Sequence, residues 1–256
     1  MSSSAEQRAV AVRYDGLRAE DLEQRLDVPK VMLFERIGST LDVAHCVAPE
    51  GAPSGTLILA DEQTAGRGRM GRSWRSEAGA GIWLTLVERP RDLAAISVLA
   101  VRIGLALASV LDADAEASVG LKWPNDLYVG RRKLGGILVE ARWRDSLPEW
   151  TAIGVGINVR APSEEPRAAG LRRGVDRLAI LSRAVPAIRS AAAHTGLLQP
   201  REVEAFASRD IFSGRLCVEP VVGRVRGIDS SAALLVDVGS TIATVRAGSL
   251  VLEEEM

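Results

Sequence analysis

A loop rich in glycine and arginine, residues 63–74, constrains the fold of this chain most strongly. It reads Gln-Thr-Ala-Gly-Arg-Gly-Arg-Met-Gly-Arg-Ser-Trp, so three glycines alternate with three arginines between Gly66 and Arg72. Glycine lets a backbone approach a ligand closely, and arginine offers planar, paired donors to phosphate or carboxylate. We therefore expect a loop that wraps an anion. A solvated basic turn and an RGG-like nucleic-acid segment remain open as alternatives.

The surroundings of this loop exclude two common nucleotide-binding folds. A Walker loop would end in Gly-Lys-Ser/Thr, and this stretch does not. Gly66, Gly68 and Gly71 fit the Gly-x-Gly-x-x-Gly pattern, but no amphipathic helix follows them, as a dinucleotide-binding fold would require. Residues 76–81 are turn-like and residues 82–87 predict a strand. The loop is therefore expected to join two strands.

Composition narrows the class of protein. A net charge of −1 gives no general attraction to nucleic acid or to anionic membranes. Two cysteines and two histidines make neither a disulfide framework nor a zinc site. The polar N-terminus lacks the apolar core of a signal peptide. The apolar run 93–111 contains Arg102 at its middle, which favours a buried helix over a membrane span. We expect a cytoplasmic protein.

Hydrophobic periodicity predicts short strands, several with interior glycines, around the loop. Gly135, Gly136, Gly154 and Gly156 weaken a strand but let a ligand lie on the backbone. From residue 211, short strands separated by Gly, Asp and Ser predict a small barrel-like unit. We expect an N-terminal extension (1–30), a central domain (31–210) and a C-terminal domain (211–256). Strands are expected at 31–37, 56–60, 82–87, 119–122, 127–129, 134–141 and 150–159, and helices at 40–47, 93–111, 175–195 and 200–208.

Five motifs, taken together, resemble the biotin–protein ligase family in order and spacing. The Gly-Arg-Gly-Arg-x-Gly-Arg-x-Trp loop paired with Lys-Trp-Pro-Asn-Asp is the most specific combination. The resemblance covers residues 31 to 160 and, more loosely, the C-terminal β unit. The motifs are Gly38-Ser39-Thr40, residues 61–74, Lys122-Trp123-Pro124-Asn125-Asp126, residues 132–140, and Gly154-Val155-Gly156-Ile157-Asn158.

The resemblance implies a fold and a reaction. The fold is α+β, with a central mixed β-sheet that has helices on one face (class II synthetase-like, the biotin–lipoate ligase fold) and a small C-terminal SH3-like β-barrel. The reaction joins biotin and ATP, carried with Mg²⁺, into biotinyl-5′-AMP and then acylates one lysine of a biotin carboxyl carrier protein. The chain is similar to the monofunctional type without an N-terminal DNA-binding domain. No DNA or membrane partner is expected, and the family includes both monomers and homodimers.

The resemblance also implies roles for individual residues. Biotin's ureido ring would be held by hydroxyl and amide groups, because each unmade bond of a buried polar group costs about 1–3 kcal/mol. Cations would neutralise the repulsion between carboxylate and α-phosphate. The catalytic residues implied are Lys133, Arg69 and Asp126, with Asp126 also touching Mg²⁺. The biotin set is Ser39, Thr40, Gln63, Gly66, Arg67, Gly68, Arg69, Lys133 and Gly136, and the ATP set is Arg69, Arg72, Trp74, Lys122, Asn125, Lys133 and Asn158.

Several simpler readings of these residues stay open. Ser39 and Thr40 could be helix caps, Trp74 a core aromatic, Asn158 a turn former and Lys122 a surface lysine. The sequence also departs from the family pattern, since Leu41 stands where Asn usually follows Ser-Thr. Because the side chain of leucine cannot hydrogen-bond, the polar contact that Asn makes in the family is either absent here or comes from another group. The competing functions are a lipoate or octanoate ligase, a nucleic-acid-binding protein, and a ligand sensor without catalysis.

Overall fold

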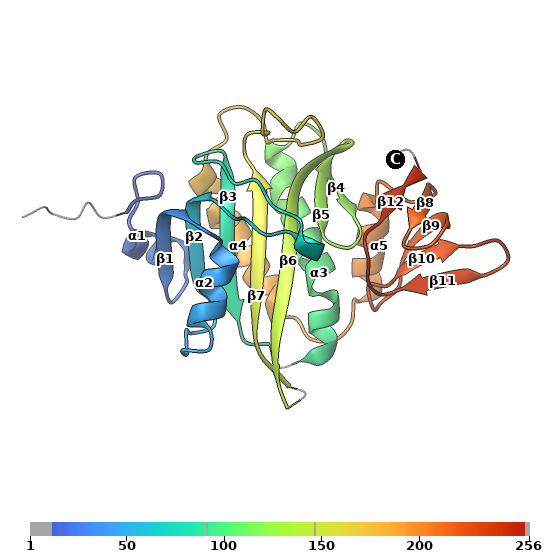
Figure 1. The fold of residues 1–256 in the computed structure, drawn as a ribbon, viewed down its shortest axis with the longest axis horizontal. Helices are drawn as coiled ribbons and strands as arrows, with labels where there is room; N and C mark the ends of the chain where they lie inside the picture. The colour runs from blue at the N-terminus through green and yellow to red at the C-terminus, as the bar shows by residue number, and fades with distance from the viewer. Residues whose placement is uncertain (1–11, 91, 146, 254–256) are drawn as a thin grey trace, which may run out of the picture.

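The structure, a computed structural model, describes residues 12–90, 92–145 and 147–253. In this part of the chain a seven-stranded sheet carries three helices on its two faces, and a five-stranded sheet lies beyond its β4 end (Figure 1). The helices are α1 (Ala19–Leu26), α2 (Thr40–Val47), α3 (Leu93–Leu111), α4 (Arg177–Ala193) and α5 (Pro200–Arg209), with 3-10 turns at Arg69–Gly71 and Asp112–Asp114.

The large sheet is mixed and has the order β1-β2-β3-β7-β6-β5-β4. The pair β1–β2 is parallel and the other neighbours are antiparallel. This confirms the predicted central mixed sheet. Its strands are β1 (Val31–Ile37), β2 (Thr56–Gln63), β3 (Gly81–Glu88), β4 (Val119–Lys122), β5 (Asp126–Val129), β6 (Arg132–Arg144) and β7 (Leu147–Asn158).

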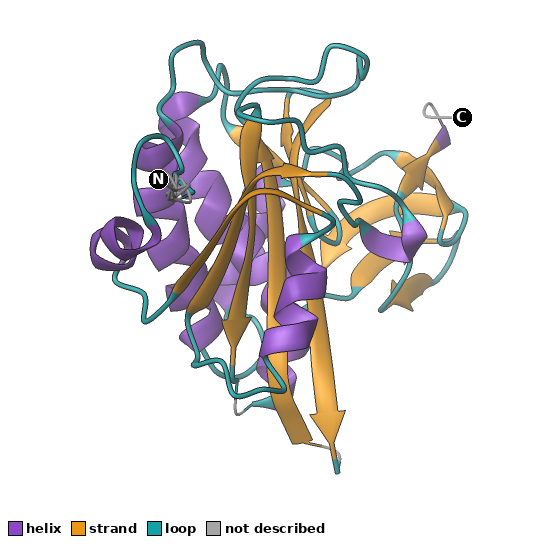
Figure 2. Cartoon of the chain, turned by 60° about the vertical axis from the view of Figure 1, so that its left-hand side comes forward, coloured by secondary structure: helices purple, strands orange, loops and turns teal. Residues whose placement is uncertain are grey.

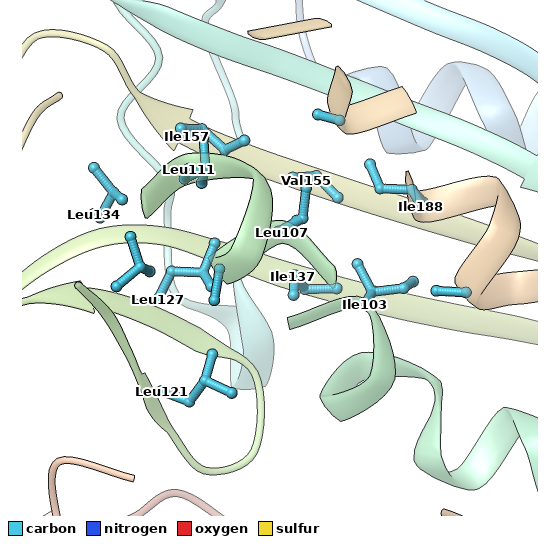
Figure 3. Close-up of a cluster of buried hydrophobic side chains, with 14 of the residues drawn as sticks. Ile103, Leu107, Leu111, Leu121, Leu127, Leu134, Ile137, Val155, Ile157 and Ile188 are labelled. Atoms are coloured by element: carbon cyan, nitrogen blue, oxygen red, sulfur yellow. The ribbon is translucent and has the colours of Figure 1, made fainter. Parts of the chain in front are cut away.

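One face of this sheet is covered by α3 and α4, which lie together on the same side in Figure 2. Asp92 caps α3 by accepting a hydrogen bond from the amide of Ala94. Ile103, Leu107 and Leu111 of α3 pack against β6 and β7 (Figure 3).

The segment Leu93–Asp114, which contains α3, is long and apolar enough to cross a membrane, and it is the one such helix in the described part of the chain. In the structure it is a core helix. The charged residue of α3, Arg102, is only 4% exposed and forms an ion pair with Glu202 of α5 at 2.7 Å. The prediction of a buried helix is confirmed.

The opposite face carries α2, which adds a helix to the one-faced arrangement that the sequence suggested. Leu41, Ala44 and Ala48 pack there against Ile58 and Val87 of the sheet. Because successive side chains of a strand point to opposite faces, Ile58 faces α2 while its neighbours Leu57 and Leu59 join the core under α3 and α4.

The N-terminal segment contributes to the same core. Tyr14, Leu22 and Leu26 are buried in the cluster that contains α3 and α4. Arg177, at the start of α4, stacks on Tyr14 and forms ion pairs with Asp15 and Asp61. Part of the predicted extension, residues 12–30, is thus packed onto the large sheet, while residues 1–11 lie outside the described residues.

The C-terminal unit is a five-stranded antiparallel sheet of order β11-β10-β9-β8-β12. Its composition and position fit the expected SH3-like domain, although no pairing of β11 with β12 closes a barrel in the described residues. The indole N–H of Trp123 donates to the carbonyl of Ala232 at 2.8 Å and links the two units. The strands are β8 (Leu216–Glu219), β9 (Gly223–Ile228), β10 (Leu234–Asp237), β11 (Ile242–Val245) and β12 (Val251–Leu252).

Candidate active site

A cavity of about 770 Å³ lies on the α2 face of the large sheet. The glycine-arginine loop, the start of α2, strands β6 and β7, the loop at 162–168 and residues 249–251 line it. All but one of the predicted site residues meet there: Ser39, Thr40, Gln63, Arg67, Gly68, Arg69, Arg72, Trp74, Lys122, Asn125, Asp126, Lys133, Gly136 and Asn158. Gly66 is the exception and lines an adjoining cavity of about 690 Å³ between the loop and β6.

The floor of the cavity is made by glycines that face each other across two strands. Gly136 of β6 pairs with Gly156 of β7, and the indole of Trp74 lies over both. A Cβ atom on Gly156 would come within 2.5 Å of Trp74 Nε1, so this position requires glycine for close approach. Trp74 Nε1 is buried and has no hydrogen-bond partner among the described residues. This nitrogen therefore packs against the backbone of Gly156 as an unpaired buried donor.

One end of the cavity is polar and uncharged. The amide N–H of Thr40 donates to Gln63 Oε1 at 2.8 Å, and the Thr40 hydroxyl lies 3.1 Å from the same oxygen. Ser39 occupies the N-cap position of α2, but its side chain makes no capping hydrogen bond. Ser39 Oγ is buried without a partner among the described residues. The simple capping reading therefore fails for the Ser39 side chain.

The other end of the cavity carries cations. Lys133 Nζ lies 2.7 Å from Asp126 Oδ2 and 5.3 Å from the centroid of the Trp74 ring. Lys122 lies over the rings of Tyr128 (5.8 Å) and Phe212 (4.9 Å). Lys122 lies on β4 and Lys133 on β6, and β5 lies between these two strands in the sheet.

The three arginines of the loop have different surroundings. Arg69 is half-buried, and this burial lowers the pKa of its guanidinium, which stays charged at any physiological pH. It donates to the carbonyl of Gly248 at 3.0 Å and to Asn125 Oδ1 at 3.4 Å. Arg72 is exposed at the cavity wall.

Arg67 differs, because carboxylates outside the loop already match its charge. Its guanidinium lies 3.0 Å from Asp42 of α2 and 2.6 Å from Glu140 of β6. The resemblance placed Arg67 among the biotin-binding residues. In the structure the Arg67 side chain lines the cavity and is bound to these two acidic groups.

The structure adds residues that the sequence analysis missed. Glu164, Arg167 and residues 249–251 line the cavity. Arg75 Nη1 donates to Glu164 at 2.6 Å, which joins the end of the glycine-arginine loop to the 162–168 loop. No periodicity or motif marks these segments, so only tertiary packing reveals them.

Two of the remaining predicted residues are buried at the cavity wall. Leu41 is 3% exposed and packs over Gly154, where a Cβ atom would come within 3.0 Å of it. Asn158, at the end of β7, is also 3% exposed. As for metals, the described residues contain no group of three His, Cys, Asp or Glu side chains that could hold one.

These features suit a small ligand with a neutral, hydrogen-bonding head and an anionic end. Ser39, Thr40 and Gln63 line the cavity from β2 and the start of α2, whereas Lys133 lies on β6 and Arg69 contacts Asn125 beside β5, on the other side of the strand order. Between them the glycine floor leaves room for an apolar body. The cations at the second end can bring a carboxylate and a phosphate together.

Comparison with known proteins places this arrangement in a family. Residues 33–158 match the model of the Biotin/lipoate A/B protein ligase family. The biotin–[acetyl-CoA-carboxylase] ligase of Mycobacterium tuberculosis is 36% identical over 232 residues, which cover 84% of this chain and 85% of that protein. The bifunctional ligase/repressor BirA of Bacillus spizizenii is 39% identical over 151 residues, 59% of this chain and 45% of that protein. The chain thus spans about half the length of the curated Bacillus relatives.

Solved structures show the same fold. Biotin protein ligase from Aquifex aeolicus, in complex with biotin and ATP, has a TM-score of 0.68 and 23% identity and covers 88% of this chain and 99% of that chain. The Leishmania major enzyme in complex with biotinyl-5-AMP has a TM-score of 0.55 and 25% identity and covers 86% and 99%. On the sequence match across most of both chains, and with this shared fold, the chain belongs to the biotin protein ligase family.

Proposed function

We propose that this protein activates biotin with ATP as biotinyl-5′-AMP and then transfers biotin to a lysine of a biotin carboxyl carrier protein. The relatives named as biotin–[acetyl-CoA-carboxylase] ligases support both the substrate and the acceptor class. The observation that carries the proposal is the cavity itself, which joins a neutral polar end to a cationic end across a glycine floor.

The polar end suits the ureido ring of biotin. This ring has two N–H donors and one carbonyl acceptor, and a buried site must satisfy all of them. Ser39 Oγ is a buried hydroxyl without a partner among the described residues, and Thr40 and Gln63 lie beside it. Backbone groups around Gly66, Gly68 and Gly136 are the further contacts that we propose for biotin.

The cationic end suits the first step of the reaction. A carboxylate oxygen of biotin attacks the α-phosphorus of ATP, the bond to the bridging oxygen breaks, and pyrophosphate leaves. Lys133, Arg69 and Arg72 would cancel the repulsion between the two anions and stabilise the charge that develops on the leaving group. Asp126, 2.7 Å from Lys133, would hold the ammonium in place.

The nucleotide would lie along the wall that contains Trp74 and Asn158, with an aromatic face and a buried amide beside the base. Lys122 and Asn125 would contact its phosphates. Mg²⁺ would enter bound to ATP, because it binds through few carboxylates together with phosphate oxygens. Asp126 is the carboxylate that we propose to touch it.

In the second step the neutral amine of the acceptor lysine attacks the acyl carbon, AMP leaves with the electrons of the broken bond, and the amine loses a proton. Asp126 is the group that we propose to orient this amine or accept its proton. We place this reaction in the cytoplasm, where ATP is available and where Cys46 and Cys217, both free in the structure, would stay reduced.

A lipoate or octanoate ligase is the alternative, because it would share the family and the acylation of lysine. Its acyl substrates have no ureido ring, so they would leave the buried hydroxyl of Ser39, beside Thr40 and Gln63, without a partner. The polar end therefore favours biotin.

Release of pyrophosphate from ATP tests the proposal, with biotin, lipoate and octanoate compared as substrates. We expect release with biotin only, and a loss of about 10²–10³-fold in Lys133→Ala, as for removal of a charged group from a developing anion. Lys30→Ala removes an exposed lysine outside the cavity and serves as the matched control. Release with lipoate or octanoate alone would identify the alternative function instead.

A further inference from the structure

Two hydroxyl residues behind the polar end, Thr85 and Ser76, do not line the cavity but contact residues that do. Thr85 is fully buried on β3, and its hydroxyl lies 2.9 Å from the hydroxyl of Thr40. Ser76 is 3% exposed, and its hydroxyl accepts from Gln63 Nε2 at 2.8 Å. Hydrogen bonds connect four side chains into one row, in the order Thr85, Thr40, Gln63 and Ser76.

The direction of each hydrogen bond in this row follows from the chemistry of its members. Gln63 Oε1 can only accept, and it receives the backbone N–H of Thr40 at 2.8 Å. The Thr40 hydroxyl, 3.1 Å from the same oxygen, must therefore donate its proton to Gln63. Since that proton is used, the contact with Thr85 requires the Thr85 hydroxyl to donate to Thr40.

This direction decides what Thr40 offers to a ligand. A hydroxyl has one proton and two lone pairs. In the row, the Thr40 proton points to Gln63 and one lone pair receives Thr85, so the remaining lone pair is the group that the hydroxyl can turn toward the cavity. Donation by Thr85 also polarises the Thr40 hydroxyl and fixes its rotamer.

We propose that Thr85 is a positioning residue for recognition of the biotin head, because it fixes the Thr40 hydroxyl as an acceptor for a ring N–H of the ligand. This inference rests on the proposed function and adds to it a residue that does not touch the substrate. Thr85 lies among Ile58, Val87 and Gly154 on the α2 face, so its hydroxyl has an apolar setting and its one partner in the described residues is Thr40.

Isosteric substitution separates the hydroxyl of Thr85 from its packing. Thr85→Val keeps the shape and removes the donor, while Thr85→Ser keeps the donor and removes the methyl group. Thr151→Val is the matched control, because Thr151 is also fully buried on the sheet, but its hydroxyl has no partner among the described residues and it does not line the cavity.

Calorimetric titration with biotin alone and steady-state pyrophosphate release are the two measurements. For Thr85→Val we expect a roughly tenfold increase in both the Kd and the KM for biotin, with kcat and the KM for ATP within about twofold of wild type. Thr85→Ser should recover biotin binding to within about twofold of wild type, and Thr151→Val should equal wild type. Thermal melting of each variant verifies that it is folded.

Two outcomes overturn the inference but not the proposed function. If Thr85→Val binds biotin as wild type does, the row does not position Thr40. If Thr85→Ser is impaired as much as Thr85→Val, the methyl group and not the hydroxyl is what matters. A wild-type chain that binds no biotin would instead reject the proposed function itself, and the inference with it.

Discussion

The two faces of the seven-stranded sheet use the same strands but different residues. Along β7, Ile153 and Val155 point into the core under α3 and α4, whereas Gly154, Gly156 and Asn158 face α2 or line the cavity. The alternation has the period of two that every strand has. The first face therefore supplies most of the apolar burial. The second has a smaller apolar cluster with α2, and at the carboxyl end of β7 it leaves room and polar groups for a ligand.

Because of this difference, substitutions that lower stability should be separable from substitutions that weaken ligand binding. Burial of branched apolar side chains stabilises the fold, so substitutions on the α3–α4 face should change the free energy of unfolding. Glycine and hydroxyl residues on the α2 face contribute little burial, so substitutions there should change ligand binding in a protein that is still folded. The following variants test that separation, from the largest expected effect to the smallest.

Ile153→Ala should have the largest effect, and on stability. Ile153 is fully buried in the core under α3 and α4, and truncation of such a side chain costs about 2–5 kcal/mol through lost burial and the cavity left behind. Urea unfolding followed by circular dichroism measures this loss, and Ile153→Val, expected to cost about 0.5–1.5 kcal/mol, grades it. A folded Ile153→Ala protein whose biotin Kd had risen severalfold would show that the two faces are not independent.

Gly156→Ala should act on the opposite face and on catalysis. The added Cβ would lie 2.5 Å from Trp74 Nε1, so the indole must move off the glycine floor. Displacement of a positioning group by about 1 Å costs on the order of a hundredfold in rate, and we expect that loss in biotin-dependent pyrophosphate release with an unchanged fold.

Gly104→Ala is the control for this substitution, because it adds the same methyl group on the other face. Its Cβ would meet Leu121 at 3.4 Å and Ile137 at 3.7 Å, which is ordinary contact, and alanine also favours the helix. We expect activity within about twofold of wild type. Equal loss in both variants would mean that any added methyl group disturbs the site, and the close approach of Trp74 would no longer explain it.

The layout of the site was predictable where local patterns carry the information. Strand β1, helix α2 and helix α3 have the predicted bounds, because alternation, capping and apolar periodicity are local properties. Predicted site residues from five separate motifs converge on one cavity. That convergence follows from the family resemblance of the motifs, since no local pattern brings Ser39 and Lys133 together.

The partners of the loop arginines could not be predicted, because they depend on contacts between distant segments of the chain. Arg67 binds Asp42 and Glu140, which lie 25 and 73 residues away in the chain. The carbonyl of Gly248 accepts from Arg69 across 179 residues. A charged side chain has many sequence partners of opposite sign, and only the packed fold selects among them. The sequence could therefore identify the arginines as a group but not assign a separate partner to each.

Glu140→Gln tests whether the ion pair of Arg67 with a distant carboxylate matters, and it should have the smallest effect. The substitution keeps the shape of the side chain but removes the charge that holds Arg67 at 2.6 Å. Because the Arg67 and Glu140 side chains are 39% and 26% exposed, solvent screens the pair, and a pair of this kind contributes about 0–1 kcal/mol. The loop should then open more often, with faster tryptic cleavage in residues 67–72 and about a two- to threefold higher Kd for biotin.

Glu149→Gln is the control for this substitution. It removes an ion pair of 2.7 Å with Arg144 at the far end of the β6–β7 hairpin, outside both cavities, and should change neither the cleavage rate nor the Kd. If Glu140→Gln and Glu149→Gln gave the same cleavage rate and the same biotin Kd, the ion pair of Arg67 with Glu140 would not stabilise the closed loop.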